Sequence, residues 1–352
     1  MTARIWLMEG LSSQRDIIQG IKAFSKSHQL DVEVFASHRH HRNEILSPAD
    51  FALLEPADEP QRLDFILATV NKHAIQAIHT GRHALWFETQ RATLEAGGVK
   101  LTTGATRLDS LELADNKVTF AQQMAKHGLP VVPSIPVNSP AELRQLLATS
   151  PFFAQQLCIK PVSGIYGMGF WCFDDSVSPM AAFTHPDSRK VNTRHYLNAL
   201  ETSASFEPLV LMPYLPGPEY SVDILAERGT VLAAVARRKE GALQYLENSG
   251  EAFELAKACA QVMGADGLVN VQTRHDSRGK PLLLEINMRP SGGIGYTRFS
   301  GINLPGLFAF RQLGLMDPQA VTDEARRAFS PATVRAVTDV IHYNATLPNL
   351  IQ

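Results

Sequence analysis

The sequence has few of the residues that build disulfide frameworks and structural metal sites. It contains three cysteines, Cys158, Cys172 and Cys259, which lie far apart and form neither a CxxC motif nor another paired spacing. This pattern argues against a disulfide-stapled fold or a zinc site and is typical of a reducing compartment, so we expect a cytoplasmic protein. No segment approaches the roughly 18 apolar residues of a membrane span, and the first apolar stretch is too short for a signal peptide.

Positive charge is not in excess either. The formal net charge is −2 at pH 7, so no basic field indicates a nucleic-acid partner, and any phosphate binding would depend on local groups. We therefore expect small-molecule ligands, and neither a nucleic acid nor a membrane as partner. The 352 residues, 45% of them hydrophobic, predict two or three packed units. A homodimer is the usual expectation for a soluble enzyme of this size.

Helical and extended segments alternate over the first hundred residues. The expected strands are 4–8, 31–36, 75–79 and 99–102, and the expected helices are 14–25, 60–73 and 82–96. Such alternation predicts a parallel sheet covered by helices, as in a Rossmann-like α/β domain. The first turn, residues 9–13, lacks the GxGxxG fingerprint, so a dinucleotide is not expected there.

The pattern changes after Gly104. A helix is expected from Asp115 to His127, followed by a β-prone stretch at 131–137. The later helices are expected near 139–149, 192–202, 250–262 and 304–314, and hairpin turns at 226–230 and 276–280. This second part is therefore predicted to be an α+β domain.

A glycine-rich loop follows a short strand that ends in Lys160 and Pro161. Three glycines, Gly164, Gly167 and Gly169, would let the backbone approach a ligand and direct N–H groups at anionic oxygens, with Lys160 adding a positive charge. An ordinary hairpin loop is the alternative, because the P-loop pattern is absent.

The segment 209–223 reads as an apolar strand, a proline-stiffened hinge and a second strand beginning at Glu219. The carbonyl group of Pro213 can accept from an exocyclic amine, and Glu219 can accept from sugar hydroxyls. The alternative is a simple bend with Glu219 solvated at its edge.

Four oxygen-bearing side chains occur on two expected strands around the turn 276–280. Period-two alternation would place Asn270, Gln272, Glu285 and Asn287 on one face. Carboxylate and amide oxygens suit Mg²⁺, which takes its remaining ligands from substrate phosphates. A nucleotide is therefore expected.

Together these elements resemble the ATP-grasp superfamily, especially the carboxylate–amine ligases and the synthetase halves of the carbamoyl-phosphate synthase large subunit. Four elements follow the order of the family: the helix start at 115–117, Lys160 with its glycine loop, the hinge at 217–219, and the pair of strands that ends in 285–290. The resemblance covers about residues 105–315. It implies α/β plus α+β architecture, with a Rossmann-like pre-ATP-grasp domain (1–105) followed by a two-lobed ATP-grasp fold (106–352, with lobes 106–210 and 211–352).

The resemblance implies a role for each matching residue. It assigns phosphate contacts to Lys117 and Lys160, the closing loop to Ser163, Gly164, Gly167 and Gly169, adenine contacts to Pro213 and Leu215, ribose binding to Glu219, and metal ligation to Gln272, Glu285 and Asn287. ATP and one or two Mg²⁺ ions are implied, and Mn²⁺ can substitute. Arg289 matches the arginine that stabilises an acyl-phosphate, so Lys160 and Arg289 are the expected catalytic residues.

Two positions depart from the family pattern. Met212 stands where a glutamate is usual at the start of the hinge, which removes a polar contact to the base. Gln272 stands where many relatives have an aspartate, which leaves Glu285 as the one assigned carboxylate.

The expected substrates are a small carboxylate and an amine, joined through an acyl-phosphate without an enzyme nucleophile. Ser291, Gly292 and Gly293 resemble the segment whose N–H groups lie near the acyl-phosphate, although a flexible turn is the alternative. Arg237 is a candidate carboxylate clamp or a solvated basic edge. The basic segment 38–42 is expected to be mostly a surface loop, and contact with an anionic substrate or a partner is the alternative.

Two other functions stay open. One is phosphorylation of a carboxylate or carbamate without amide formation. The other is a nucleotide-binding regulatory protein without turnover, which Met212 and the single carboxylate favour.

Overall fold

The computed structural model describes residues 2–11, 13–149, 151–152, 156–163, 168–338, 340–343 and 346–351. The chain folds into two compact units. Unit 1 comprises Met1–Glu112, Pro218–Thr273 and Ile286–Gln352, and unit 2 comprises Leu113–Gly217 and Arg274–Glu285. The domain limits expected from the sequence stay a prediction.

Unit 1 begins with a five-stranded parallel sheet in the order β3-β2-β1-β4-β5. Its strands are β1 (Ala3–Met8), β2 (Val32–His38), β3 (Phe51–Leu54), β4 (Ala77–Thr80) and β5 (Lys100–Thr102). The helices are α1 (Ser13–Ser27), α2 (Asn43–Leu46), α3 (Glu59–His73), α4 (Ala84–Thr89) and α5 (Arg91–Ala96). The expected Rossmann-like α/β architecture is confirmed. Strand order reverses between β1 and β4, and ligands bind at such a switch point in open parallel sheets.

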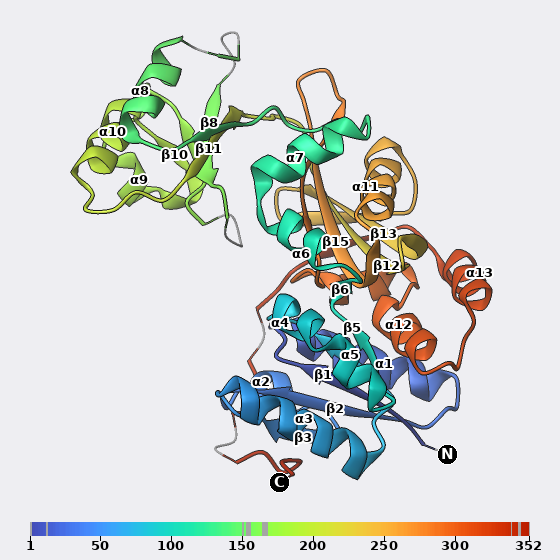
Figure 1. The fold of residues 1–352 in the computed structure, drawn as a ribbon. Helices are drawn as coiled ribbons and strands as arrows, with labels where there is room; N and C mark the ends of the chain where they lie inside the picture. Colours follow the sequence, from blue (N-terminus) through green and yellow to red (C-terminus); the bar gives the residue numbers. More distant parts are fainter. Residues whose placement is uncertain are drawn as a thin grey trace. The chain divides into compact units, whose positions relative to one another are not determined.

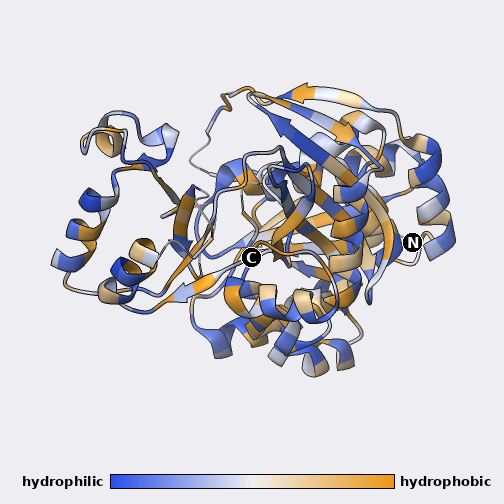
Figure 2. Cartoon of the chain, turned by 90° about the horizontal axis from the view of Figure 1, so that it is seen from above, coloured by the Kyte–Doolittle hydropathy of each residue, from blue (hydrophilic) through white to orange (hydrophobic). Residues whose placement is uncertain are grey.

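Alternating side chains of β1 bury both faces of this sheet. Ile5 and Leu7 pack with the apolar stripe of α1, whereas Trp6 and Met8 pack with residues of α3, α4 and α5. The helices therefore cover both faces, as Figure 1 shows. Figure 2 shows the matching hydropathy pattern, with hydrophobic residues concentrated in strands and striped along helices.

The structure differs from the expected secondary structure in several details. Strand β3 and helix α2 were missed, because four-residue elements carry too little periodicity to be recognised. The helix expected over 82–96 is interrupted at Gln90, which has φ −95° and ψ −2°. The helix expected from Asp115 begins at Lys117, because the side chain of Asn116 caps it by accepting from the N–H groups of Val118 and Thr119.

Unit 1 also carries most of a second sheet, in the order β16-β15-β12-β13-β14-β17, with β6 (Gly104–Ala105) paired to β15. Its strands are β12 (Glu219–Glu227), β13 (Thr230–Glu240), β14 (Leu243–Glu247), β15 (Ala265–His275), β16 (Pro281–Asn287) and β17 (Ala332–Arg335). The helices are α11 (Glu251–Val262), α12 (Leu304–Gln312) and α13 (Pro318–Ala328), with a 3₁₀ helix at Ile294–Ser300. Strands β12 and β13 form the expected antiparallel hairpin.

Unit 2 contains a sheet in the order β10-β9-β8-β11-β7. Its strands are β7 (Ile135–Val137), β8 (Leu157–Pro161), β9 (Trp171–Phe173), β10 (Lys190–Val191) and β11 (Leu209–Pro213). Helices α7 (Lys117–Lys126), α8 (Pro140–Thr149), α9 (Ala181–Thr184) and α10 (Thr193–Thr202) accompany it, with a 3₁₀ turn at Pro186–Ser188, and α6 (Leu108–Asp115) leads into it. Alternation along β11 sends Leu209 and Leu211 to one apolar cluster and Val210 and Met212 to another. No helix among the described residues is long and apolar enough to cross a membrane.

Candidate functional site

Strand β8 brings together the two lysines predicted to contact phosphates. The Nζ of Lys117 donates to the carbonyl oxygen of Val162 over 3.3 Å, just beyond the end of β8. Lys160, within β8, has its Nζ 3.9 Å from Oε2 of Glu285, and the two side chains are only 13% and 23% exposed. Two cations and one carboxylate thus share one end of unit 2, partly withdrawn from water.

The glycine loop after Lys160 is described only at its two ends. Gly164 and Gly167 lie outside the described residues, whereas Ser163 is exposed and precedes them. Gly169 has φ +73°, and a Cβ there would lie 2.8 Å from ring carbons of Pro161. A glycine is therefore required at this position.

An apolar cluster covers the face of the unit 2 sheet that includes Met212. Its buried members are Val118, Val132, Cys158, Cys172, Val210, Met212 and Leu215. Leu215 is thus buried, and the carbonyl oxygen of Pro213 accepts a weak bond from Sγ of Cys158 at 3.7 Å. Such a surface could hold a flat apolar ring. Leu215 belongs to this cluster, and Pro213 directly follows its member Met212.

Arg237 is the centre of a buried polar network in unit 1. Its guanidinium donates to Oδ2 of Asp223 at 2.7 Å, and to Oε1 of Gln244, Oγ of Ser221 and Oγ of Ser291, each at 2.8 Å. Because Arg237 is 3% exposed, the solvated basic edge considered above is wrong. The sequence did not identify Ser221, Asp223 or Gln244, although alternation along β12 places Ser221 and Asp223 on one face.

The same network fixes the segment predicted to lie near an acyl-phosphate. The hydroxyl of Ser291 accepts from Arg237 and also from the N–H of Gly293 at 3.1 Å. A Cβ on Gly293 would lie 2.5 Å from Nη1 of Arg237, so a larger residue there would have to displace the guanidinium. Gly292 between them is exposed. The segment is thus held at its ends, with its middle residue open to solvent.

The predicted metal and ribose residues have protein partners. Oδ1 of Asn287 accepts from Arg289 at 3.2 Å, and Glu219 forms an ion pair with Lys239 on the opposite strand. Gln272 is half-buried on β15. The described residues contain no group of three or more histidine, cysteine or acidic side chains placed to hold a metal. These amide and carboxylate oxygens fit only a Mg²⁺ that takes most of its ligands from phosphate and water.

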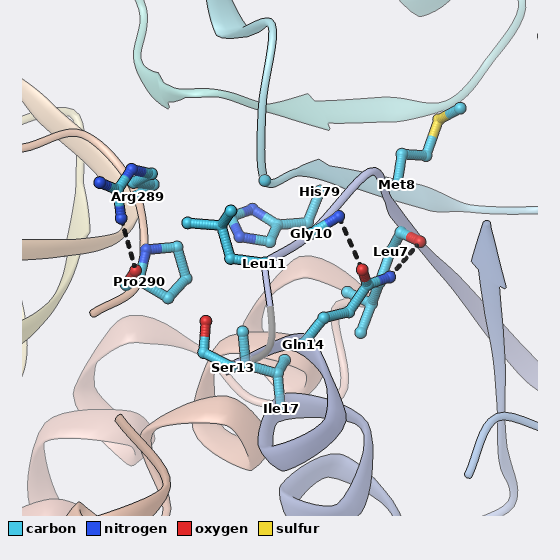
Figure 3. Close-up of a pocket in the computed structure, with 11 residues that line it drawn as sticks. Leu7, Met8, Gly10, Leu11, Ser13, Gln14, Ile17, His79, Arg289 and Pro290 are labelled. Carbon is cyan, nitrogen blue, oxygen red and sulfur yellow. Dashed lines mark hydrogen bonds between the residues drawn. The ribbon is translucent and has the colours of Figure 1, made fainter. Parts of the chain in front are cut away.

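A pocket of about 310 Å³, including space open to solvent, lies within unit 1 where β1 and β4 end. Its lining residues are Leu7, Met8, Gly10, Leu11, Ser13, Gln14, Ile17, His79, Gly81, Arg289 and Pro290. In Figure 3, His79 lies at the centre of the view, with Arg289 and Pro290 on one side and Gln14 and Leu7 on the other. Except for Arg289, the sequence did not identify these residues.

Two glycines let the pocket form at the strand-order reversal. A Cβ on Gly81 would lie 2.5 Å from Cα of Gly10, so the two turns touch backbone to backbone. The side chain of Gln14 locks the first turn by accepting from the N–H of Gly10 and donating to the carbonyl oxygen of Leu7.

Comparison with known proteins gives one family model and several similar folds. A family model described as "ATP-grasp in the biosynthetic pathway with Ter operon" matches residues 205–340. The fold is similar to an L-amino acid ligase from Bacillus licheniformis, with TM-score 0.61 and 16% identity, covering 94% of this chain and 78% of that one.

The fold is also similar to a carboxyaminoimidazole ribonucleotide synthase from Aspergillus clavatus complexed with ATP, with TM-score 0.63, 16% identity and coverage of 91% and 79%. A third similar structure is the biotin carboxylase domain of the Hydrogenobacter thermophilus 2-oxoglutarate carboxylase, solved with MgADP and bicarbonate, with TM-score 0.59, 16% identity and coverage of 89% and 70%. No curated protein sequence matches significantly.

The chain has the fold of ATP-grasp enzymes, and residues 205–340 match an ATP-grasp family model. The two-part architecture expected from the sequence, a parallel α/β domain followed by an ATP-grasp fold, is thereby confirmed.

The expectation that the basic segment 38–42 is mostly a surface loop is only partly correct. His38 is buried at the end of β2, and Arg39 pairs with the buried Glu9. Burial alone would raise the pKa of Glu9, but hydrogen bonds from His83 and Arg39 hold that pKa well below its usual range. Only His40 and His41 are exposed. Ion pairing within the fold therefore explains Arg39.

Proposed function

We propose that this ATP-grasp protein is an ATP-dependent ligase that activates a carboxylate as an acyl-phosphate and joins it to an amine, releasing ADP and phosphate. The observation that carries the proposal is the approach of Lys160 to Glu285, 3.9 Å apart and largely withdrawn from solvent, with Lys117 anchored nearby on Val162. A lysine beside a carboxylate in a site partly shielded from solvent suits a polyphosphate with a bound metal ion. The lysine offsets phosphate charge, and the carboxylate can ligate the metal ion.

The reaction proceeds in two displacements. A carboxylate oxygen of the substrate attacks the γ-phosphorus, the bond to the bridging oxygen breaks, and ADP leaves. The amine nitrogen then attacks the acyl carbon, the carbon–oxygen bond breaks, phosphate leaves, and the nitrogen loses a proton. Lys117 and Lys160 offset the charge on the transferring phosphoryl group, and Arg289 offsets the charge on the acyl-phosphate.

Glu285, Gln272 and Asn287 would supply oxygen ligands to a Mg²⁺ bound with ATP, and the ion would offset phosphate charge there. The adenine would lie against the cluster that contains Leu215, and Glu219 would accept from the ribose. Arg237 positions the segment Ser291–Gly293 through the hydroxyl of Ser291. The similar amino acid ligase and ribonucleotide synthase support carbon–nitrogen bond formation as the reaction type.

The test is ADP release from Mg-ATP with pairs of amino acids and small carboxylic acids. We expect release that requires both a carboxylate and an amine, with a product mass equal to the two substrates less one water. Glu285→Gln and Lys160→Met should each lower turnover by about 100-fold or more, since each removes a charge from the phosphate site. The control is Glu254→Gln, because Glu254 is exposed and its ion pair with Lys257 lies at the surface of α11. Full turnover in Glu285→Gln would contradict the proposal.

A second candidate is phosphorylation of a carboxylate or carbamate without amide formation. The likeness to a carboxylase domain solved with bicarbonate favours it. Product analysis separates the two, because only the ligase incorporates the amine.

A further inference from the structure

The imidazole of His79 lines the unit 1 pocket, and one of its two ring nitrogens, Nε2, lacks a hydrogen-bond partner in the part of the chain that the structure describes. Its Nδ1 lies 3.1 Å from Oγ1 of Thr102, and that hydroxyl donates its own hydrogen to the carbonyl oxygen of Ile78. Thr102 must therefore accept from Nδ1–H, which leaves Nε2 unprotonated. Nε2 is buried and has no hydrogen-bond partner among the described residues.

The environment of His79 keeps the ring neutral. Burial lowers its pKa to about 4, and hydrogen bonding to the backbone of Thr102 opposes this only in part. The ring is 3% exposed and packs edge-on against Phe308, with 4.9 Å between centroids. A buried acceptor left unsatisfied costs about 1 to 3 kcal/mol, so a ligand that donates a hydrogen bond would relieve that cost.

The rest of the lining limits what such a donor can be. Both polar atoms of the Gln14 side chain are bonded to the first turn, and the lining contains no carboxylate in the part of the chain that the structure describes. No carboxylate of the described wall would offset the charge of an ammonium ion, and the charge of Arg289 would oppose it. The pocket therefore favours a neutral donor with apolar surface, which Leu11 and Ile17 can cover.

We propose that this pocket is the binding site of the amine substrate, and that Nε2 of His79 accepts a hydrogen bond from the N–H of the neutral amine. The inference rests on the ligase function proposed above. Accepting one N–H leaves the nitrogen lone pair free, and Arg289, the residue assigned to the acyl-phosphate, lies in the same wall. His79 would then select and orient the nucleophile.

The first test does not need turnover. Long-range ¹H–¹⁵N spectra of the histidine-labelled protein, assigned with His79→Gln, would report both ring nitrogens while amino acids are added without ATP. We expect Nε2 to be unprotonated in the free protein and its signal to move on addition of at least one amine. A protonated Nε2, or no response to any amine in the panel, would overturn the proposal.

The second test uses steady-state kinetics. His79→Phe keeps a ring against Phe308 but removes the acceptor, and should raise KM for the amine about tenfold while KM for ATP is unchanged. His79→Gln, which can place an oxygen near the position of Nε2, should recover part of this loss, and His127→Gln at an exposed histidine serves as control. An unchanged KM for the amine in His79→Phe would refute the assignment. A moving Nε2 signal without ligation would retain the pocket and reject the ligase.

Discussion

The buried ion pair of Arg237 and Asp223 allows a quantitative test of the unit 1 network. The two side chains are 4% and 0% exposed, and their nearest atoms are 2.7 Å apart. At an effective dielectric constant near 20 the gross attraction is about 6 kcal/mol, from which desolvation must be subtracted. Removing one partner leaves the other charge buried without compensation, so Asp223→Asn should lower the free energy of unfolding by about 3 to 5 kcal/mol.

Urea denaturation followed by circular dichroism measures this loss. The exposed pair of Glu254 and Lys257 is the control, and Glu254→Gln should cost less than about 1 kcal/mol. Replacing both partners together, as Arg237→Met with Asp223→Leu, should restore much of the stability, because no charge is then left unpaired. A loss below about 1 kcal/mol in Asp223→Asn would refute the reasoning.

Three further predictions concern local geometry. Gly293→Ala should reduce ligation by about tenfold or more without loss of ATP binding, measured by titration calorimetry, because its Cβ would displace Arg237. The folded pKa of His79 lies below the unfolded value, so its contribution to stability is full above pH 6.5 and is lost as pH falls toward 4. Between pH 6.5 and pH 4, the free energy of unfolding should therefore fall by up to about 3 kcal/mol more in the wild type than in His79→Phe. Urea denaturation at a series of pH values measures this difference. Cys158 and Cys172 are directly opposite on β8 and β9, so mild oxidation with diamide should join them and lower the mass by two hydrogens. Three free thiols after this treatment, or a disulfide that involves Cys259, would contradict the prediction.

Local pattern predicted the first sheet because its strands and helices follow one another in sequence. Apolar alternation in β1 and the stripe of α1 both follow from residues a few positions apart. Strand β3 was missed because Phe51–Leu54 is short, and its place beside β2 depends on pairing rather than on pattern.

From the sequence, candidate site residues could be named only where they lie within one short motif. Lys160 and Glu285 were predicted from the motifs around them, whereas the partners of Arg237 lie 14 and 54 residues away at Asp223 and Ser291. His79 gave no signal, because an apolar strand with one histidine reads as core. Its significance depends on Thr102 and on a pocket that only the folded chain forms.

The most direct test of the central claim follows the oxygen of the carboxylate substrate. With a substrate pair that releases ADP, the carboxylate is labelled with ¹⁸O and the phosphate product is analysed by mass spectrometry. An acyl-phosphate requires one ¹⁸O to pass from the carboxylate to each phosphate released together with the condensed product. Phosphate without label would contradict carboxylate activation and with it the proposed ligase.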